Sequence, residues 1–233
     1  MKRWLFVGKS DKRDLLLYLC SALAASGLRV LLVDATEDNK YRYSVRGMEP
    51  LLPVTEFCGF DVALGLSATT QGEPGCASYE KYDYELYDLQ SLRYFSYESF
   101  SSADEVLWVT TFDRYEVESS AAWFRSLLHT WPELKGLRVR SVYIRTVDSF
   151  LNTEYIMGFM DGLPIDWHPQ EISIPWNELN LAVQIENDHA NQLRIKRISR
   201  SYKRALRSLL EELTGWEAAS AKKALRRAER RQA

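Results

Sequence analysis

One short loop near the start of the chain carries the residues with the clearest potential for chemistry, Gly8-Lys9-Ser10-Asp11-Lys12-Arg13. It lies between an apolar segment and a segment with helical periodicity, which is the setting of a phosphate-binding loop. Such a loop needs glycines whose backbone N–H groups wrap phosphate oxygens, a lysine for the β and γ phosphates, and a Ser or Thr for magnesium. Lys12 stands where the lysine belongs, but Asp11 replaces the preceding glycine and Arg13 replaces the hydroxyl. The loop has the outline of a nucleotide site without the residues that hold a triphosphate.

A carboxylate in this loop opposes nucleotide binding. Two unit charges about 4 Å apart repel by about 4 kcal/mol at an effective dielectric constant of ~20, which is roughly a thousandfold in affinity. Asp11 and Asp14 also lie at the start of the predicted helix, where they are expected to occupy the anion site from within. Against this, Lys9, Lys12 and Arg13 leave the loop net positive, and a helix N-terminus can bind an anion without the motif. A solvated turn is the third interpretation.

The surrounding pattern predicts an α/β fold with a doubly wound, mostly parallel sheet of about seven strands and helices on both faces. Buried strands are predicted at 3–7, 29–33, 82–89, 105–111, 137–146 and 171–174. Helices are predicted at 15–26, 114–131, 154–160, 199–213 and 218–232. We expect one α/β domain at 1–193, a C-terminal amphipathic helix packed on it at 194–215, and a basic helical tail, ordered or mobile, at 216–233.

Bulk composition narrows the class of protein. The chain has 233 residues, of which 46% are apolar, enough to bury a large sheet. It has no apolar run of the ~18–20 residues that span a membrane and no secretory signal, so a cytoplasmic location is expected, with peripheral association at the inner face of the membrane as an extension. Three cysteines without a CxxC spacing fit reduced thiols, and three scattered histidines predict no metal site.

Charge is divided unevenly along the chain. Residues 194–233 hold 13 Lys/Arg against 4 Asp/Glu, whereas residues 1–193 hold 17 against 28, so an acidic body carries a basic end. In the last predicted helix the cations recur at i, i+4 and i+8 and form a basic stripe of Lys222, Lys223, Arg226, Arg227, Arg230 and Arg231. Three interpretations stay open: a solvated or partly disordered end, a site for an acidic protein surface or anionic lipid headgroups, and weak nucleic-acid binding.

A tyrosine-rich stretch offers a candidate protein-binding surface. Residues 79–100 include six tyrosines, and tyrosine is favoured at protein interfaces. Tyr94 and Tyr97 are the interface candidates. The alternative is that alternating aromatic side chains line the core of the domain.

Several segments, in order, resemble the ParA/MinD family of deviant-Walker ATPases (P-loop proteins of the SIMIBI class), and especially its TadZ/CpaE-like branch. The resemblance covers residues 2–185 as a series of landmarks, which are LCSALAASGLRVLLVDA at 19–35, GFDVALG at 59–65, YDYELYD at 82–88, ADEVLWVTT at 103–111 and IP at 174–175. The first is similar to the family's first helix and second strand. The third sits where the Walker B strand, ending in aspartate, would lie. The resemblance thus implies that Asp88 joins Lys12 and Asp34 in the nucleotide site.

The departures from the family pattern fall at the chemical positions. The signature lysine of KGGxGK[ST] aligns with Val7, the second aspartate of the DxD after strand two is Thr36, and the asparagine that contacts adenine is Arg145. Phosphoryl transfer rests on positioning and electrostatic stabilisation, so we expect no hydrolysis and no cofactor, with ATP and Mg²⁺ as the alternative. The vestigial nucleotide site then comprises Gly8, Lys9, Ser10, Asp11, Lys12, Arg13, Asp34 and Asp88.

The resemblance and the departures together imply a catalytically inactive ParA/MinD-like pseudo-ATPase that acts as an adaptor or localisation scaffold. Its partners would be proteins of a larger membrane-associated assembly, a bacterial pilus or secretion apparatus, and any homodimer should form without nucleotide. Two alternatives stay open. One is a divergent active ATPase, in which Lys9 is a displaced signature lysine and Asp34 holds the metal. The other is a DNA-associated partition or mobile-element protein that uses the basic tail.

Overall fold

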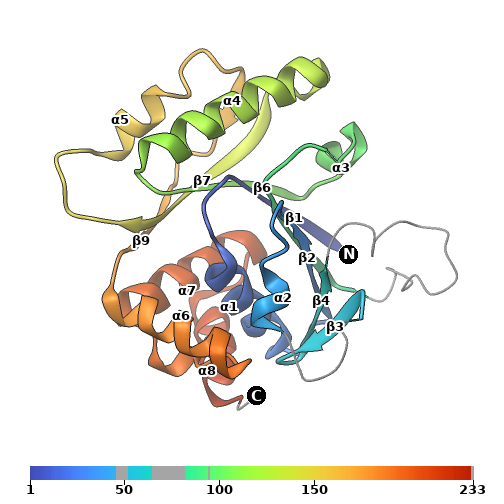
Figure 1. The fold of residues 1–233 in the computed structure, drawn as a ribbon, viewed down its shortest axis with the longest axis vertical. Helices are drawn as coiled ribbons and strands as arrows, with labels where there is room; N and C mark the ends of the chain where they lie inside the picture. The colour runs from blue at the N-terminus through green and yellow to red at the C-terminus, as the bar shows by residue number, and fades with distance from the viewer. Residues whose placement is uncertain (46–51, 65–81, 94, 232–233) are drawn as a thin grey trace, which may run out of the picture.

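One central sheet organises the chain (Figure 1). The computed structural model describes residues 1–45, 52–64, 82–93 and 95–231. The strands are β1 (Lys2–Val7), β2 (Val30–Ala35), β3 (Val54–Phe57), β4 (Phe60–Leu64), β5 (Tyr84–Leu89), β6 (Glu105–Thr110), β7 (Leu137–Thr146), β8 (Ile165–Trp167) and β9 (Ile172–Pro175). Their order is β3-β4-β2-β5-β1-β6-β7-β8, and β9 also pairs with β7. All pairs are parallel except β3 with β4.

The central strands are buried on both faces, as expected for a parallel sheet covered by helices. β2 and β5 are buried along their whole length. Their register pairs Asp34 with Asp88, and Asp88 in turn lies beside Phe6 of β1. The pairing therefore brings two carboxylates that are far apart in sequence to the same edge of the sheet, next to the loop that follows β1.

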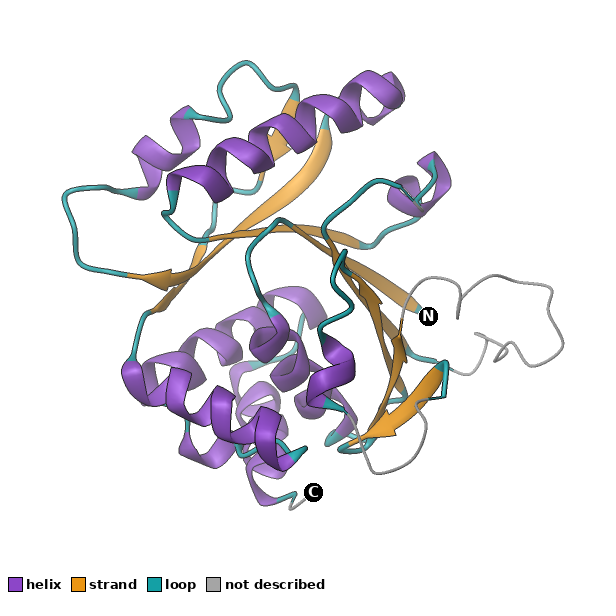
Figure 2. Cartoon of the chain, in the orientation of Figure 1, coloured by secondary structure: helices purple, strands orange, loops and turns teal. Residues whose placement is uncertain are grey.

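The helices form one layer on each face of the sheet (Figure 2). They are α1 (Arg13–Ala24), α2 (Tyr41–Ser44), α3 (Tyr97–Ser101), α4 (Arg114–Thr130), α5 (Thr153–Gly158), α6 (Glu178–Ala190), α7 (Arg200–Thr214) and α8 (Ala218–Arg230). Helices α1, α2, α6, α7 and α8 lie on one side, and α3, α4 and α5 lie on the other (Figure 1). Each layer has its own hydrophobic core against the sheet.

Helix α1 is buried on every side. All ten residues from Leu15 to Ala24 are buried, and a helix that is apolar all round must be enclosed by other elements. The sheet covers one side of α1, and α7 and α8 cover the other. The two C-terminal helices therefore complete the layer to which the loop belongs.

The basic segment at the end of the chain is a packed helix within the described residues. α8 buries an alanine-rich face made of Ala221, Ala224, Leu225 and Ala228, and small side chains let it lie close to α1 and α7. Arg231, just past its end, donates from Nη2 to the Ala24 carbonyl oxygen at 3.1 Å, at the C-terminus of α1. The outer face of α8 carries the predicted basic stripe, exposed at Lys222, Lys223, Arg226, Arg227 and Arg230, whereas Arg231, also predicted in the stripe, lies beyond the helix and bonds to Ala24.

The predicted fold class is confirmed, with a mostly parallel sheet between two helical layers. Each predicted strand is present, and β3, β4 and β8 add short strands at the two ends of the sheet. Helix α6, at 178–190, was not predicted because its exposed face is unusually apolar and its buried face includes Asn180 and Asn187. No helix in the described part of the chain has the length and apolar character needed to cross a membrane.

Candidate functional site

The loop after β1 closes around its own lysine. The Lys12 side chain is fully buried, and its Nζ lies 2.6 Å from Asp88 Oδ1. The same ammonium donates hydrogen bonds to the carbonyl oxygens of Gly8 at 2.8 Å and Ser10 at 3.4 Å. Two of the three N–H donors of the ammonium therefore meet carbonyl oxygens, and its charge is paired with Asp88. The cation that the sequence assigns to phosphate oxygens is bound by the chain itself.

A tyrosine from the segment after β2 donates hydrogen bonds to both carboxylates, Asp34 and Asp88. Tyr41 donates its hydroxyl to Asp88 Oδ2 at 2.8 Å, and its backbone N–H donates to Asp34 Oδ2 at 3.3 Å. Asp34 Oδ1 also accepts from Thr36, from the hydroxyl at 2.5 Å and from the backbone N–H at 3.0 Å. Burial raises the pKa of both Asp34 and Asp88. Both carboxylates are thus enclosed by donors from the protein.

A second contact holds the other side of the loop. Ser10 donates its hydroxyl to Glu116 Oε2 at 2.5 Å, and Thr111 donates its own hydroxyl to the same oxygen at 2.5 Å. Glu116 lies in the first turn of α4 and therefore links the loop to the opposite helical layer. Gly8 has φ +134°, and a Cβ at this position would lie 2.2 Å from the Val109 carbonyl oxygen. The loop is fixed between β6, α4 and the Lys12 contacts.

Asp11 is held by Arg13 and does not face across the loop, which corrects the expected arrangement. Arg13 donates from Nε and Nη2 to the Asp11 carboxylate at 3.0 and 2.9 Å, and its backbone N–H donates to Asp11 Oδ1 at 3.2 Å. Burial raises the pKa of Asp11, but the hydrogen bonds from Arg13 outweigh it and the pKa lies below its usual value. Arg13 Nη1 also lies 3.5 Å from Asp188 Oδ2 of α6.

Asp11 and Asp14 were both expected at the anion site of the helix start; Asp11 Oδ1 does accept from the backbone N–H of Arg13, the first residue of α1, whereas Asp14 also contacts helix α7. The Tyr202 hydroxyl donates to Asp14 Oδ2 at 2.8 Å. Burial raises the pKa of the Asp14 carboxyl, although the nearby Arg145 and the hydrogen bond from Tyr202 oppose this. The acidic side chains of the loop are therefore committed to internal partners, and neither offers a free charge at the helix start.

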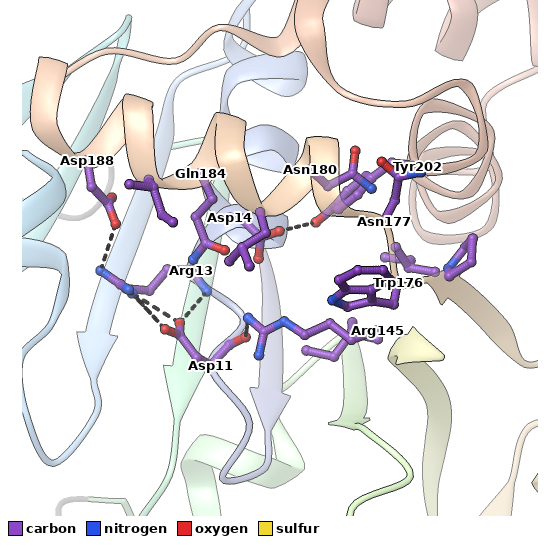
Figure 3. A pocket seen from close by; sticks show the side chains of 15 residues that line it. Asp11, Arg13, Asp14, Arg145, Trp176, Asn177, Asn180, Gln184, Asp188 and Tyr202 are labelled. Atoms are coloured by element: carbon purple, nitrogen blue, oxygen red, sulfur yellow. Dashed lines mark hydrogen bonds and ion pairs between the residues drawn. The ribbon is translucent and has the colours of Figure 1, made fainter. Parts of the chain in front are cut away.

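A pocket of about 410 Å³ lies beside the loop (Figure 3). It is bounded by the start of α1, the ends of β7 and β9, and α6, and its apolar wall is formed by Ile144, Ile174, Pro175, Trp176, Leu181 and Ile185. Arg145 enters the pocket from the end of β7 with a left-handed φ of +53°. Its Nη2 donates to the Asp11 carbonyl oxygen at 2.8 Å. A non-glycine residue in this conformation is uncommon, and such residues cluster at functional sites.

The structure gathers most of the predicted site residues at this edge of the sheet, which are Gly8, Ser10, Asp11, Lys12, Arg13, Asp34 and Asp88. Lys9 differs, since its Nζ lies 3.0 Å from Glu37 Oε1 on the surface. Tyr94 lies outside the described residues. Tyr97 is partly exposed. It lies on α3, the helix that leads into the start of β6, whereas the site lies where the strands end.

Sequence reasoning missed Tyr41 and Glu116, although both touch the site. Tyr41 belongs to a polar segment with no helical or strand periodicity, so only its contact with Asp88 shows its role. Glu116 follows the helix cap Asp113 by three positions, a spacing that marks a helix start but not a contact with a distant loop.

In this conformation the loop does not present its lysine to a phosphate. Lys12 is buried and its ammonium contacts Asp88 and two carbonyl oxygens, and Arg13 supplies no oxygen to a metal. Across the parts of the chain that the structure describes, no group of three or more His, Cys, Asp or Glu side chains is placed to hold a metal ion. A bound triphosphate would require the loop to open and the contact between Lys12 and Asp88 to break.

Comparison with family models and curated proteins finds no match, whereas comparison with solved structures finds many. No protein-family model matches the chain, and no curated protein matches it significantly. The fold is that of MinD and ParA-family ATPases. A chain of the MinC:MinD cell division protein complex of Aquifex aeolicus superposes with a TM-score of 0.66 over 93% of this chain and 97% of that one, at 15% identity.

Two further solved structures give the same result. The cell division ATPase MinD of Pyrococcus furiosus matches with a TM-score of 0.60 at 18% identity, covering 96% of this chain and 99% of that one. A ParA-family ATPase of Chlorobium tepidum matches with a TM-score of 0.57 at 15% identity, covering 99% and 100%. At these identities the similarity establishes the fold, and the chemistry must be argued from the residues of this chain.

Proposed function

We propose that this protein is a pseudo-ATPase with the MinD/ParA fold, a catalytically inactive adaptor or localisation scaffold that works through protein–protein interactions. The observation that carries the proposal is the buried contact between Lys12 and Asp88 at 2.6 Å. It fills the place of a lysine–phosphate contact with a contact inside the protein. The substitutions at Val7, Asp11, Arg13 and Thr36 point the same way, because each replaces a group that would hold phosphate, metal or water.

The energetic argument is that nucleotide would have to open a site already satisfied. Breaking a buried ion pair by removing one partner costs about 3–5 kcal/mol. A triphosphate must displace the Asp88 carboxylate from Lys12 and detach Ser10 from Glu116. Each 1.4 kcal/mol lost in this way weakens binding about tenfold. The closed loop also needs no nucleotide to hold its shape, which suits a scaffold.

Titration with ATP and MgCl₂ by isothermal calorimetry, together with thermal unfolding, tests the loss of nucleotide binding. We expect no saturable heat and no shift in melting temperature. A ligand present at 100 times its dissociation constant would stabilise the protein by about 2.7 kcal/mol. A stabilisation of that size that disappears in Lys12→Ala, or phosphate release that depends on Lys12, would instead establish the divergent ATPase.

The adaptor role is supported by exposed apolar side chains in the stretch of chain between β7 and the end of α6. Phe150 is 96% exposed, and Trp176 and Ile185 are each 51% exposed. Val147, Tyr155, Leu179 and Leu181 are also exposed in the same part of the chain, between β7 and the end of α6. Exposed apolar groups that gather in one region mark interaction surfaces.

We propose that the partners are proteins of a larger assembly at the inner face of a membrane, a pilus or secretion apparatus in the interpretation taken from the sequence. Capture from native lysate, comparing the wild type with Phe150→Ser, tests the apolar surface. Retention of the same partners by the variant would contradict its use. Light scattering after gel filtration, with and without ATP, tests the proposal that any homodimer forms without nucleotide.

A DNA-associated role remains the second candidate, because cations on α8 are free. Within the described residues, no ion pair is formed by Lys222, Lys223, Arg226, Arg227 or Arg230. Substituting Lys222, Lys223, Arg226 and Arg227 by Gln removes charge and leaves the buried alanine face in place. Steeply salt-dependent retention of DNA that this variant loses would favour the DNA role. Retention on anionic vesicles, lost in the same variant, would favour membrane contact.

A further inference from the structure

The pocket beside the loop contains a buried donor with no partner. Asn180 of α6 is 8% exposed, and its Oδ1 accepts from the Ser199 backbone N–H at 2.8 Å. Its Nδ2 is buried and has no hydrogen-bond partner in the structure. An unsatisfied buried donor costs about 1–3 kcal/mol. The amide is oriented by Ser199, so the unpartnered Nδ2 lies in the wall of the pocket that Asn180 lines, and a small side-chain shift would have to expose it to an acceptor.

Arg145 is a cation of the pocket lining that forms no close ion pair with a described residue, although its charge acts to lower the pKa of the nearby Asp11 and Asp14 carboxyls. Its only hydrogen bond among the described residues runs from Nη2 to the Asp11 carbonyl oxygen, and no ion pair with a described carboxylate is formed. Figure 3 shows the guanidinium extending from the end of β7 toward Asp11, below Asp14 and Gln184. Nε and Nη1 remain free to donate, and a guanidinium presents them in a fork that matches a carboxylate.

The acidic side chains of the lining are all engaged. Asp11 and Asp188 both contact Arg13, and Asp14 accepts from Tyr202. A cationic ligand would therefore find no free carboxylate. Arg145 and Asn180 contribute donors, and the Gln184 amide contributes both a donor and an acceptor, so donors predominate and favour a ligand that brings acceptors.

The rest of the lining selects an apolar body. The apolar wall of the pocket includes Ile144, Ile174 and Ile185. The half-exposed indole of Trp176 also lines the pocket. The volume of about 410 Å³ lies within the range of small-molecule sites, roughly 300–1,000 Å³. It accommodates a molecule of amino-acid size.

We propose that this pocket binds a small organic acid with an apolar body. The carboxylate pairs with Arg145, a second acceptor oxygen meets Asn180 Nδ2, and the apolar group packs on the isoleucine wall and Trp176. The inference does not depend on the loss of hydrolysis, because the two side chains proposed to bind the acid, Arg145 and Asn180, lie outside the phosphate loop. ATP binding and acid binding are measured in separate titrations, so either can fail alone.

Calorimetric titration with 3-phenyllactate and with 2-hydroxy-4-methylpentanoate tests the proposal. The primary amides of both acids serve as matched neutral ligands. We expect one site per chain for at least one acid, with its amide binding at least tenfold more weakly. Adenosine is titrated alongside, and we expect it to bind more weakly than that acid. Arg145→Gln, which removes the charge and keeps the length, should weaken the acid at least tenfold. Arg125→Gln, on the exposed face of α4, should leave binding unchanged.

Asn180→Asp gives a second, independent variant. It keeps the Oδ1 acceptor for Ser199, removes the free donor and adds a repelling charge, so acid binding should fall at least tenfold. Circular dichroism confirms that each variant is folded, and Arg145→Met, which also removes the charge, replaces Arg145→Gln if the latter is not. Absence of saturable binding by both acids, equal binding of acid and amide, preference for adenosine, or unchanged binding in both pocket variants would each overturn the proposal.

Discussion

The Tyr202 hydroxyl lies 2.8 Å from Asp14 Oδ2 and donates to it, which joins the C-terminal helix α7 to the first turn of α1. The two residues are separated by most of the chain, yet both line the same pocket, Tyr202 buried and Asp14 half-buried. Tyr202 also packs edge-on against Tyr18, with ring centroids 5.7 Å apart. The C-terminal helices thus hold the start of α1, and through it the loop, in place.

Replacing Tyr202 by Phe should destabilise the fold. The change removes one hydroxyl and leaves the half-buried Asp14 carboxyl without its donor, which costs about 1–3 kcal/mol. Urea unfolding at neutral pH measures the loss. Tyr155→Phe, at an exposed position of α5, is the matched control and should change the free energy of unfolding by less than about 0.5 kcal/mol. Equal effects of the two substitutions would show that the contact contributes nothing.

The raised pKa of Asp14 predicts how the stability of the protein depends on pH. Burial raises this pKa in the folded state, so the folded protein binds the proton more tightly than the unfolded chain. The Asp14 contribution to stability therefore declines as the pH rises from the unfolded-state value of about 3.9, and it becomes constant above the folded-state pKa. In Asp14→Asn this decline is absent. Urea unfolding of both proteins from pH 4 to pH 8 should show the wild type losing stability relative to the variant, and parallel curves would refute the assignment.

The contact between Lys12 and Asp88 should behave as one unit. Lys12→Met leaves a buried carboxylate without its cation, and Asp88→Asn leaves a buried ammonium without its anion, so each should cost about 3–5 kcal/mol. The double variant should cost much less than the sum, because neither charge is then left alone. Denaturant unfolding of the four proteins measures the coupling. Lys9→Met, which breaks only the surface contact with Glu37, should cost at most about 1 kcal/mol, and additive costs at Lys12 and Asp88 would contradict the buried pair.

Much of the fold can be predicted from the local pattern of apolar residues, whereas only some of the site residues can. The apolar runs of β1, β2, β5 and β6 predict a parallel sheet because strands buried on both faces have no polar side. The same register places Lys12, Asp34 and Asp88 together. Their partners could not be predicted, since Tyr41 and Glu116 reach the site through long-range contacts that leave no periodic trace in the sequence.

The packing of α8 against the domain could not be predicted from the sequence either, and it can be tested by substitution. Its inner face is mostly alanine, which looks too thin to bind anything, but small side chains allow close approach to α1 and α7. Ala221 is fully buried, so Ala221→Glu places an unpaired charge in that contact and should cost at least about 3 kcal/mol. Ala219→Glu, at an exposed position of the same helix, should be nearly neutral. Proteolysis with trypsin reports the outcome directly. In Ala221→Glu the basic helix should be cleaved rapidly, and resistance equal to that of Ala219→Glu would show that α8 does not pack as the structure has it.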